Sequence, residues 1–172
     1  MSNAGERARR LQAAARFQPA RIELLLIADA PPAADRYFYF TDVANYDSLF
    51  RNVVWHTLGI APSRANKADL LGRLRDAGVF LIDLCLDPIF EARERRTCVD
   101  DLISRVSDLS PQHIILIKVT TFDTAFDSLK KAGLPVVNKS IPFPGSGHQI
   151  EFAEAFGSAL EAIEWRKPEP RS

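Results

Sequence analysis

The run Ile22-Glu23-Leu24-Leu25-Leu26-Ile27 has the continuous apolar character of a β-strand that is buried on both faces. Three later runs share its short length and its content of Ile, Val and Leu, at residues 79–82, 113–119 and 134–137. Parallel strands that are covered by helices on both faces have this composition. We therefore expect one mainly parallel, four-stranded sheet, with the strand order 79–82, 22–27, 113–119, 134–137.

The stretches between these runs have the spacing of apolar residues that is typical of amphipathic helices. The clearest runs from Asp47 to Leu58 and ends at Gly59, and further helices are expected over residues 66–77, 98–109, 121–132 and 149–165. The alternation predicts a three-layer α/β/α sandwich, forming one domain over residues 21–165. We expect a helical N-terminal segment over residues 1–20 and a flexible tail over residues 166–172.

The composition excludes several classes of protein. The chain has 172 residues, and its 22 Lys and Arg balance its 22 Asp and Glu, which excludes the basic coat of a histone-like protein. The longest apolar runs are far shorter than the roughly 20 residues that span a bilayer. Cys85 and Cys98 are too few for a disulfide scaffold and lack the spacing of a zinc or iron–sulfur site. We expect a cytoplasmic protein with no cofactor, no metal or iron–sulfur cluster and no membrane contact.

Ligands of open α/β sheets bind at the carboxyl ends of the strands, so the segments that follow the four runs are the first candidates for a site. Asp29 follows the first run and Asp83 ends the second. Lys118-Val119-Thr120-Thr121 follows the third, and residues 141–148 follow the fourth. No phosphate loop or dinucleotide fingerprint is among them. The charged stretch Arg93-Glu94-Arg95-Arg96 is the best candidate for contacts with phosphates.

Four of these segments, taken in order, resemble motifs of the uracil-DNA glycosylase superfamily over residues 20–162. Ile27-Ala28-Asp29-Ala30-Pro31-Pro32 is similar to the family's Gly-Glu-Ala-Pro-Gly loop, and Gly78-Val79-Phe80-Leu81-Ile82-Asp83 to its Gly-Val-Tyr-Ile-Thr-Asn strand. Residues 110–117 resemble the family's next strand, and residues 141–147 its final loop, His-Pro-Ser-Pro or Pro-His-Pro-Ser-Gly. The resemblance implies the family's fold, recognition of a damaged or modified base in DNA, and hydrolysis of its N-glycosidic bond.

The resemblance also implies roles for particular residues. Asp29 would be the catalytic carboxylate, placed near the sugar or its attacking water. The base would stack on Phe40 or Tyr37, with Asp83 and Phe143 contacting it as well. The DNA would contact the last loop, which comprises Pro142, Pro144, Gly145, Ser146, Gly147 and His148.

Two replacements change what such a pocket would recognise. Phe143 or Ile141, depending on the alignment, stands where the family has a histidine that donates to the departing base. Asp83 stands where the family has an amide that reads uracil. An ionised carboxylate only accepts hydrogen bonds, so Asp83 favours a base with an amino or amidine-like edge, unless burial keeps the carboxyl group protonated and so restores a donor. We therefore expect weak or absent excision of uracil.

Three interpretations of the function remain open from the sequence. The chain is a base-processing enzyme with an altered pocket, or a non-catalytic member of the same fold that binds nucleic acid or a nucleobase-like small molecule, or an unrelated small α/β hydrolase or interaction protein. The order of the motifs favours the first two, and the neutral charge favours the last two. Cys85 and His56 are expected to be core residues, with Cys85 as an inert thiol.

Overall fold

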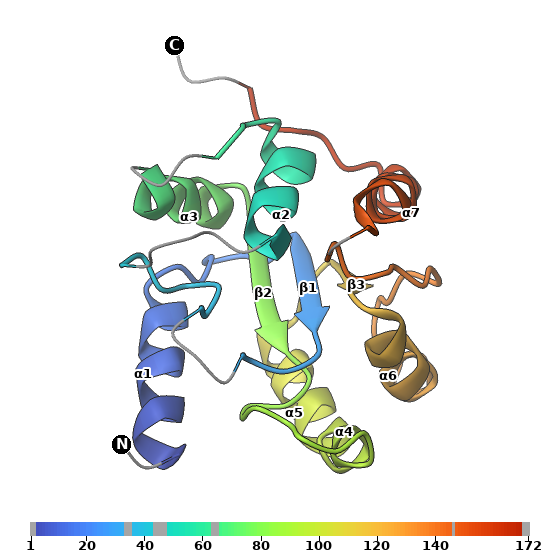
Figure 1. The fold of residues 1–172 in the computed structure, drawn as a ribbon. Coiled ribbons are helices and arrows are strands. Elements are labelled where there is room, and N and C mark those ends of the chain that lie inside the picture. The colour runs from blue at the N-terminus through green and yellow to red at the C-terminus, as the bar shows by residue number, and fades with distance from the viewer. Residues whose placement is uncertain (1–2, 33–35, 43–47, 63–65, 146, 170–172) are drawn as a thin grey trace.

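A computed structural model describes residues 3–32, 36–42, 48–62, 66–145 and 147–169. The chain is a mixed α/β protein with a parallel sheet (Figure 1). The described residues form these elements: α1 (Asn3–Ala15), β1 (Leu24–Ala28), α2 (Ser48–Leu58), α3 (Lys67–Asp76), β2 (Val79–Asp83), α4 (Glu94–Thr97), α5 (Val99–Leu109), β3 (His113–Leu116), α6 (Val119–Lys131) and α7 (Gln149–Ala162). All five helices expected between residues 47 and 165 are present, although Asp47 itself lies outside the described residues.

The sheet is parallel and has the strand order β2-β1-β3, which confirms the order expected for the first three runs. Ala28 of β1 pairs with Asp83 of β2, and Ile27 pairs with Leu116 of β3. Leu24 to Ile27 are fully buried, as continuous apolar character predicts for the central strand. This register brings the carboxyl ends of all three strands to one edge of the sheet (Figure 1).

The expected fourth strand at residues 134–137 is not a strand in the structure. Val136 makes one isolated parallel bridge with Ile114, and Ile141 makes another with Ile117. Pro135 has no N–H to donate, and residues 138–140 between the two bridges are exposed and polar. Apolar character alone therefore predicted a strand where the chain only touches the sheet at two points.

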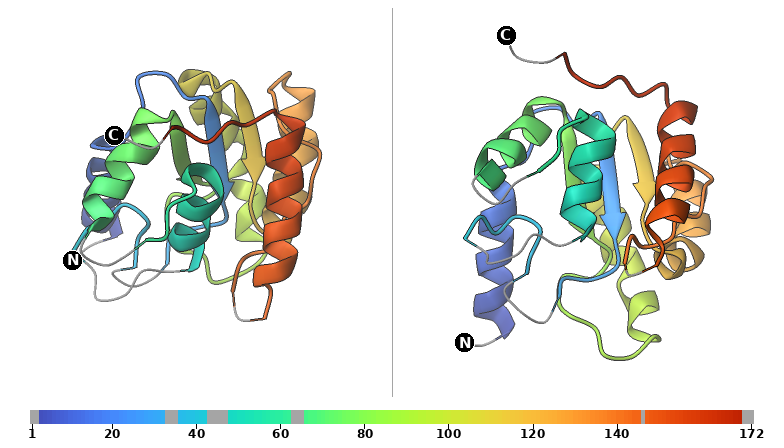
Figure 2. Two further views of the ribbon diagram at one scale, coloured as in Figure 1. Left: turned by 90° about the horizontal axis from the view of Figure 1, so that it is seen from above. Right: turned by 45° about the horizontal axis from the view of Figure 1, so that its top comes forward.

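Helices cover both faces of the sheet. Helices α2 and α7 contact each other over one face, and α5 and α6 contact each other over the other (Figures 1 and 2). The side chains on the inner face of α2, which include Phe50, Val53 and Val54, are fully buried. The apolar stripe of this helix thus covers the central strands, as its spacing predicted.

The aromatic cluster after β1 closes the outer edge of the sheet. Tyr37, Phe38 and Tyr39 are buried, and the Tyr39 hydroxyl both accepts from the Leu81 N–H and donates to the Leu81 carbonyl, at 2.7 Å in each case. β2 is an edge strand, so no strand among the described residues pairs with these backbone groups on that side. The Tyr39 hydroxyl therefore supplies both hydrogen bonds that a neighbouring strand would otherwise make with Leu81.

Helix α1 is tied to the segment that follows β2. The Arg10 side chain is 8% exposed, and its Nη2 donates to the Leu86 carbonyl at 2.9 Å and to Asp87 at 3.1 Å. Arg7 forms a second ion pair with Asp87. These contacts, together with the burial of Ala14, hold the N-terminal helix against the α/β domain.

Cys85 and Cys98 form a disulfide, with their Cα atoms 5.4 Å apart. The expectation that Cys85 is a free core thiol is therefore wrong. The two cysteines are 13 positions apart in sequence, and the chain between them returns through α4 to bring them together. Sequence spacing could not show this return, because it depends on the path of residues 86–97.

Candidate functional site

A cavity of about 370 Å³ lies at the carboxyl ends of the strands. Four of the residues predicted to contact a ligand line it: Asp29, Tyr37, Asp83 and Phe143. Its other polar lining residues are Arg36, Ser48 and Lys118, and its apolar walls include Phe38 and Leu49. Because strand ends and aromatic side chains meet here, this cavity is the best candidate for a ligand site.

Asp29 lies at the centre of the polar wall, directly after β1. Its carboxylate accepts two hydrogen bonds from the Arg95 guanidinium, Nε to Oδ1 at 2.7 Å and Nη2 to Oδ2 at 2.8 Å. The Lys118 ammonium donates to Oδ2 at 3.0 Å. Burial opposes ionisation of this carboxyl group, but the hydrogen bonds from Arg95 and Lys118 outweigh it, so the pKa of Asp29 lies below its ordinary value. We call these three residues the Asp29 triad.

The Asp29 triad carries more positive than negative charge. One carboxylate and two cations leave it with a net charge of +1. The Asp29 and Arg95 side chains are 10% and 15% exposed, whereas the Lys118 side chain is 39% exposed. Arg95 therefore acts as the buried counter-ion of Asp29, and Lys118 presents the surplus charge to the cavity.

Lys118 holds this position through an unusual backbone conformation. Its φ is +83° and its ψ is 132°, a backbone conformation that residues other than glycine rarely adopt. The Lys118 N–H donates to the Ile141 carbonyl at 2.8 Å, and the helix α6 begins at the next residue. The chain thus turns sharply from β3 into α6, with Lys118 at the corner.

Asp83 ends β2 on the other side of Asp29. The carbonyls of Asp83 and Leu84 accept hydrogen bonds from the Arg105 guanidinium at 2.9 and 2.7 Å, which fixes the backbone at the strand end. Burial raises the pKa of the neighbouring Tyr37 phenol, and the negative charge of Asp83 raises it further. Tyr37 is therefore a neutral hydroxyl at neutral pH, able to donate as well as accept.

Phe143 extends from the loop before α7 and is 41% exposed. Its ring packs close to Gly145, and the Ser48 hydroxyl donates to the Pro144 carbonyl, which ties this loop to the start of α2. Of the loop residues predicted to contact DNA, Gly147 and His148 are exposed, Pro142 and Gly145 are partly buried, and Pro144 is buried. Ser146 lies outside the described residues.

Phe40, one of the two rings expected to stack on the base, does not line the cavity. Its ring lies 5.2 Å from that of Tyr37, between centroids, and the Arg9 guanidinium lies 4.2 Å above it. Phe40 therefore packs against Tyr37 and Arg9, outside the cavity lining. His56 is partly buried and packs edge-on against Phe152 and Phe156, which fits the expected packing role.

Arg95 and Lys118 lie in segments that the sequence singled out, but their pairing with Asp29 was not predicted. The stretch 93–96 was expected to contact phosphates, but the Arg95 side chain turns inward to Asp29, while Arg93 is 84% exposed and pairs with Glu91. The pairings of Arg95 and Lys118 with Asp29 span 66 and 89 residues, so no local pattern contains them.

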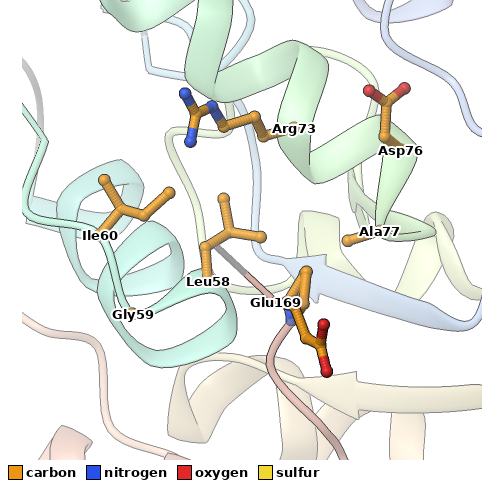
Figure 3. Close-up of a pocket in the computed structure, with 8 residues that line it drawn as sticks. Leu58, Gly59, Ile60, Arg73, Asp76, Ala77 and Glu169 are labelled. Carbon is orange, nitrogen blue, oxygen red and sulfur yellow. The ribbon is translucent and has the colours of Figure 1, made fainter. Parts of the chain in front are cut away.

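Figure 3 shows a second cavity, of about 340 Å³, lined by the C-terminal turns of α2 and α3 and by Glu169. Arg73 lines it but pairs with Asp69 at 2.9 Å, and Asp76 pairs with Arg75 at 3.4 Å. Arg73 and Asp76 are thus paired within α3, and none of the described residues that line the cavity is aromatic. It therefore offers less for recognition than the cavity beside Asp29.

No family model matches the sequence, and no curated protein matches it. Within the described ranges, no three His, Cys, Asp or Glu side chains come together in a group able to hold a metal ion. In the same part of the chain, no helix has both the length and the apolar character needed for a membrane crossing.

Proposed function

We propose that this protein recognises a nucleobase-like ring in the cavity beside Asp29, as a divergent relative of the uracil-DNA glycosylases. One observation carries the proposal: the ends of three adjacent strands bring Asp83, Asp29 and Lys118 to one cavity that also has aromatic walls. A planar ring with polar edges needs this combination, since it stacks on aromatic side chains and pairs through hydrogen bonds at its rim.

The polar groups divide the cavity into two sides. Asp83 on β2 accepts hydrogen bonds, and Lys118 after β3 donates them. Adjacent strands lie about 4.8 Å apart, so the ends of the two outer strands lie about 10 Å apart with β1 between them. A ring between them would present N–H groups to Asp83 and an acceptor or anion to Lys118. An amino or amidine-like edge, as in adenine or cytosine, meets the first requirement.

Hydrolysis of the N-glycosidic bond is the second candidate function, because Asp29 is ionised and lies at the cavity, as a catalytic carboxylate must. The charge of the Asp29 triad opposes this role. Cleavage develops positive charge on the sugar, and a group with a net charge of +1 disfavours positive charge nearby. Arg95 and Lys118 also lower the basicity of the carboxylate. Binding without rapid hydrolysis is therefore the function that the geometry supports best.

The recognition proposal is tested by calorimetric titration with adenosine, cytidine and uridine. The wild type should bind the first two more tightly, and Asp83→Asn should shift the preference toward uridine. Asp123→Asn, an exposed change on α6, is the matched control. No binding of any of the three nucleosides, or a wild-type preference for uridine, would contradict the proposal.

The aromatic wall offers a second test, again with a matched control. Phe143→Ala should weaken nucleoside binding by about tenfold, because stacking of one base is worth roughly 1–3 kcal/mol. Phe90→Ala removes a ring that is 85% exposed and does not line the cavity, so it should have no effect. Single-turnover cleavage of oligonucleotides with modified bases, by the wild type and Asp29→Asn, tests hydrolysis separately. Fast cleavage that Asp29→Asn abolishes would favour the second candidate.

A further inference from the structure

The Lys118 ammonium is a cation that the fold does not need as a counter-ion. Arg95 alone neutralises Asp29, and its two hydrogen bonds engage both carboxylate oxygens. Lys118 adds one further bond, to Oδ2 at 3.0 Å. An ammonium has three N–H donors, and the described residues accept from only one of them, so two remain for another acceptor. With 39% of its side chain exposed at the cavity wall, Lys118 can use them on a ligand.

The backbone at Lys118 makes this placement costly. A φ of +83° with an extended ψ is a conformation that glycine adopts freely and other residues adopt at a cost of about 1–3 kcal/mol. The sharp turn from β3 into α6 would be easier with glycine. A lysine at this position strains the backbone, but it also places a cation at the cavity wall.

We propose that Lys118 binds the phosphate of a nucleotide whose base occupies the cavity between Asp83 and Phe143. This inference rests on the proposed recognition of a nucleobase and specifies its ligand class. The net charge of +1 on the Asp29 triad calls for an anion, which a free base or nucleoside does not supply at neutral pH. A phosphate offers several acceptor oxygens to the two remaining N–H donors. The chain as a whole has a formal net charge of zero, so attraction of a phosphate would depend on this local positive charge.

The direct test compares nucleoside and nucleotide binding by calorimetry, with adenosine and adenosine 5′-monophosphate as probes. The wild type should bind the monophosphate at least about tenfold more tightly, the effect of one charge-assisted hydrogen-bond contact. Lys118→Gln should abolish this preference and its dependence on salt, and Lys118→Arg should restore much of it. Lys131→Gln makes the same charge change at the far, exposed end of α6 and should keep the wild-type preference.

The fold of each variant is checked by thermal unfolding. If Lys118→Gln unfolds, Lys118→Gly replaces it, because glycine suits the positive φ and also removes the cation. A glycine variant that is folded, binds adenosine normally and has lost the preference for the monophosphate would support a ligand-binding role for the side chain. A folded glycine variant that keeps the preference would overturn it.

The outcomes separate this inference from the proposed function. Equal binding of adenosine and its monophosphate by the wild type would refute the role of Lys118 and leave base recognition intact. An equal loss in Lys131→Gln and Lys118→Gln would refute it as well, since the effect would then be general charge. Binding of neither probe would contradict both proposals. Single-stranded oligonucleotides with and without a 5′-phosphate identify the source: tight binding of only the phosphorylated strand indicates a strand end, and tight binding of only the mononucleotide indicates a free nucleotide.

Discussion

Replacing Arg95 by Met removes two of the three hydrogen bonds that hold the Asp29 carboxylate. Both bonds are short, at 2.7 and 2.8 Å, and only the bond from Lys118 at 3.0 Å remains. The Asp29 side chain is 10% exposed, so little water can replace the guanidinium. The variant therefore keeps a buried carboxylate with one partner.

The expected cost follows from this geometry. Removing one partner of a buried ion pair costs about 3–5 kcal/mol when the other charge is left alone. Lys118 still compensates Asp29, so we expect a loss of about 2–3 kcal/mol in the free energy of unfolding. For a chain of this length, this loss lowers the melting temperature by roughly 5–10 °C. Arg93→Met, two residues earlier and 84% exposed, should change stability by less than about 0.5 kcal/mol.

Urea unfolding of a double-mutant cycle measures the interaction itself. Asp29→Asn with Arg95→Met removes the buried carboxylate together with its counter-ion, so the double variant should be more stable than the sum of the single losses predicts, by about 1.5–2 kcal/mol. Additive losses, or an Arg95→Met variant no less stable than Arg93→Met, would refute the assignment of Arg95 as the counter-ion.

The difference in the free energy of unfolding between wild type and Arg95→Met should depend on pH, because the pKa of Asp29 is lowered in the folded protein. The pKa of Asp29 is lower in the folded than in the unfolded chain, so its ionisation contributes stability above the unfolded pKa of about 3.9. This contribution is lost as the pH falls through the folded pKa. The gap in stability between wild type and Arg95→Met should therefore be full at pH 7 and shrink below about pH 4. A gap that stays constant across this range would show that packing, not charge, is what Arg95 contributes.

Three further changes test the fold. Tyr39→Phe should cost about 1–3 kcal/mol in urea unfolding, because it strips the Leu81 N–H and carbonyl of their buried partner, and a loss under about 0.5 kcal/mol would contradict that pairing. Thr121→Val should leave the free energy of unfolding unchanged or raise it by about 1 kcal/mol, since this fully buried hydroxyl has no hydrogen-bond partner among the described residues; a clear loss would contradict this. Reduction of the Cys85–Cys98 disulfide should lower the free energy of unfolding by about 3 kcal/mol, given that the cysteines are 13 positions apart. The reductant should not affect a variant with both cysteines replaced by Ala. A wild type of unchanged stability would show that the bridge does not form.

The parts of the fold that the sequence predicted are those with long, regular patterns. Continuous apolar runs identified β1, β2 and β3, and helical spacing identified α2, where the burial of Phe50 and Val53 matches the predicted face. The run at 134–137 was equally apolar but contains Pro135, and its residues lie partly exposed beside β3. Hydrophobicity reports burial, while a strand also needs a continuous ladder of donors, which a proline interrupts.

The sequence predicted the site residues that lie at the ends of strands. It could not predict the residues that only tertiary packing brings to the site. Asp29 and Asp83 follow directly from their places at strand ends. The partners of Asp29 do not, because a charged stretch such as residues 93–96 predicts exposed side chains, and only the folded path of the chain turns Arg95 inward. The same limit explains Phe40, since the sequence gives four consecutive aromatic residues but not which ring faces the cavity.

The position of Arg95 beside Asp29 depends on contacts that lie outside the cavity. The segment between Cys85 and Cys98 carries Arg95, and it is held at both ends by the disulfide and near its start by the ion pairs from α1 to Asp87. Because Asp29 is buried, it requires a counter-ion whether or not a ligand is present. A segment fixed in this way supplies that counter-ion permanently. Lys118 is therefore not required to neutralise Asp29, which leaves its ammonium for the phosphate contact that we propose.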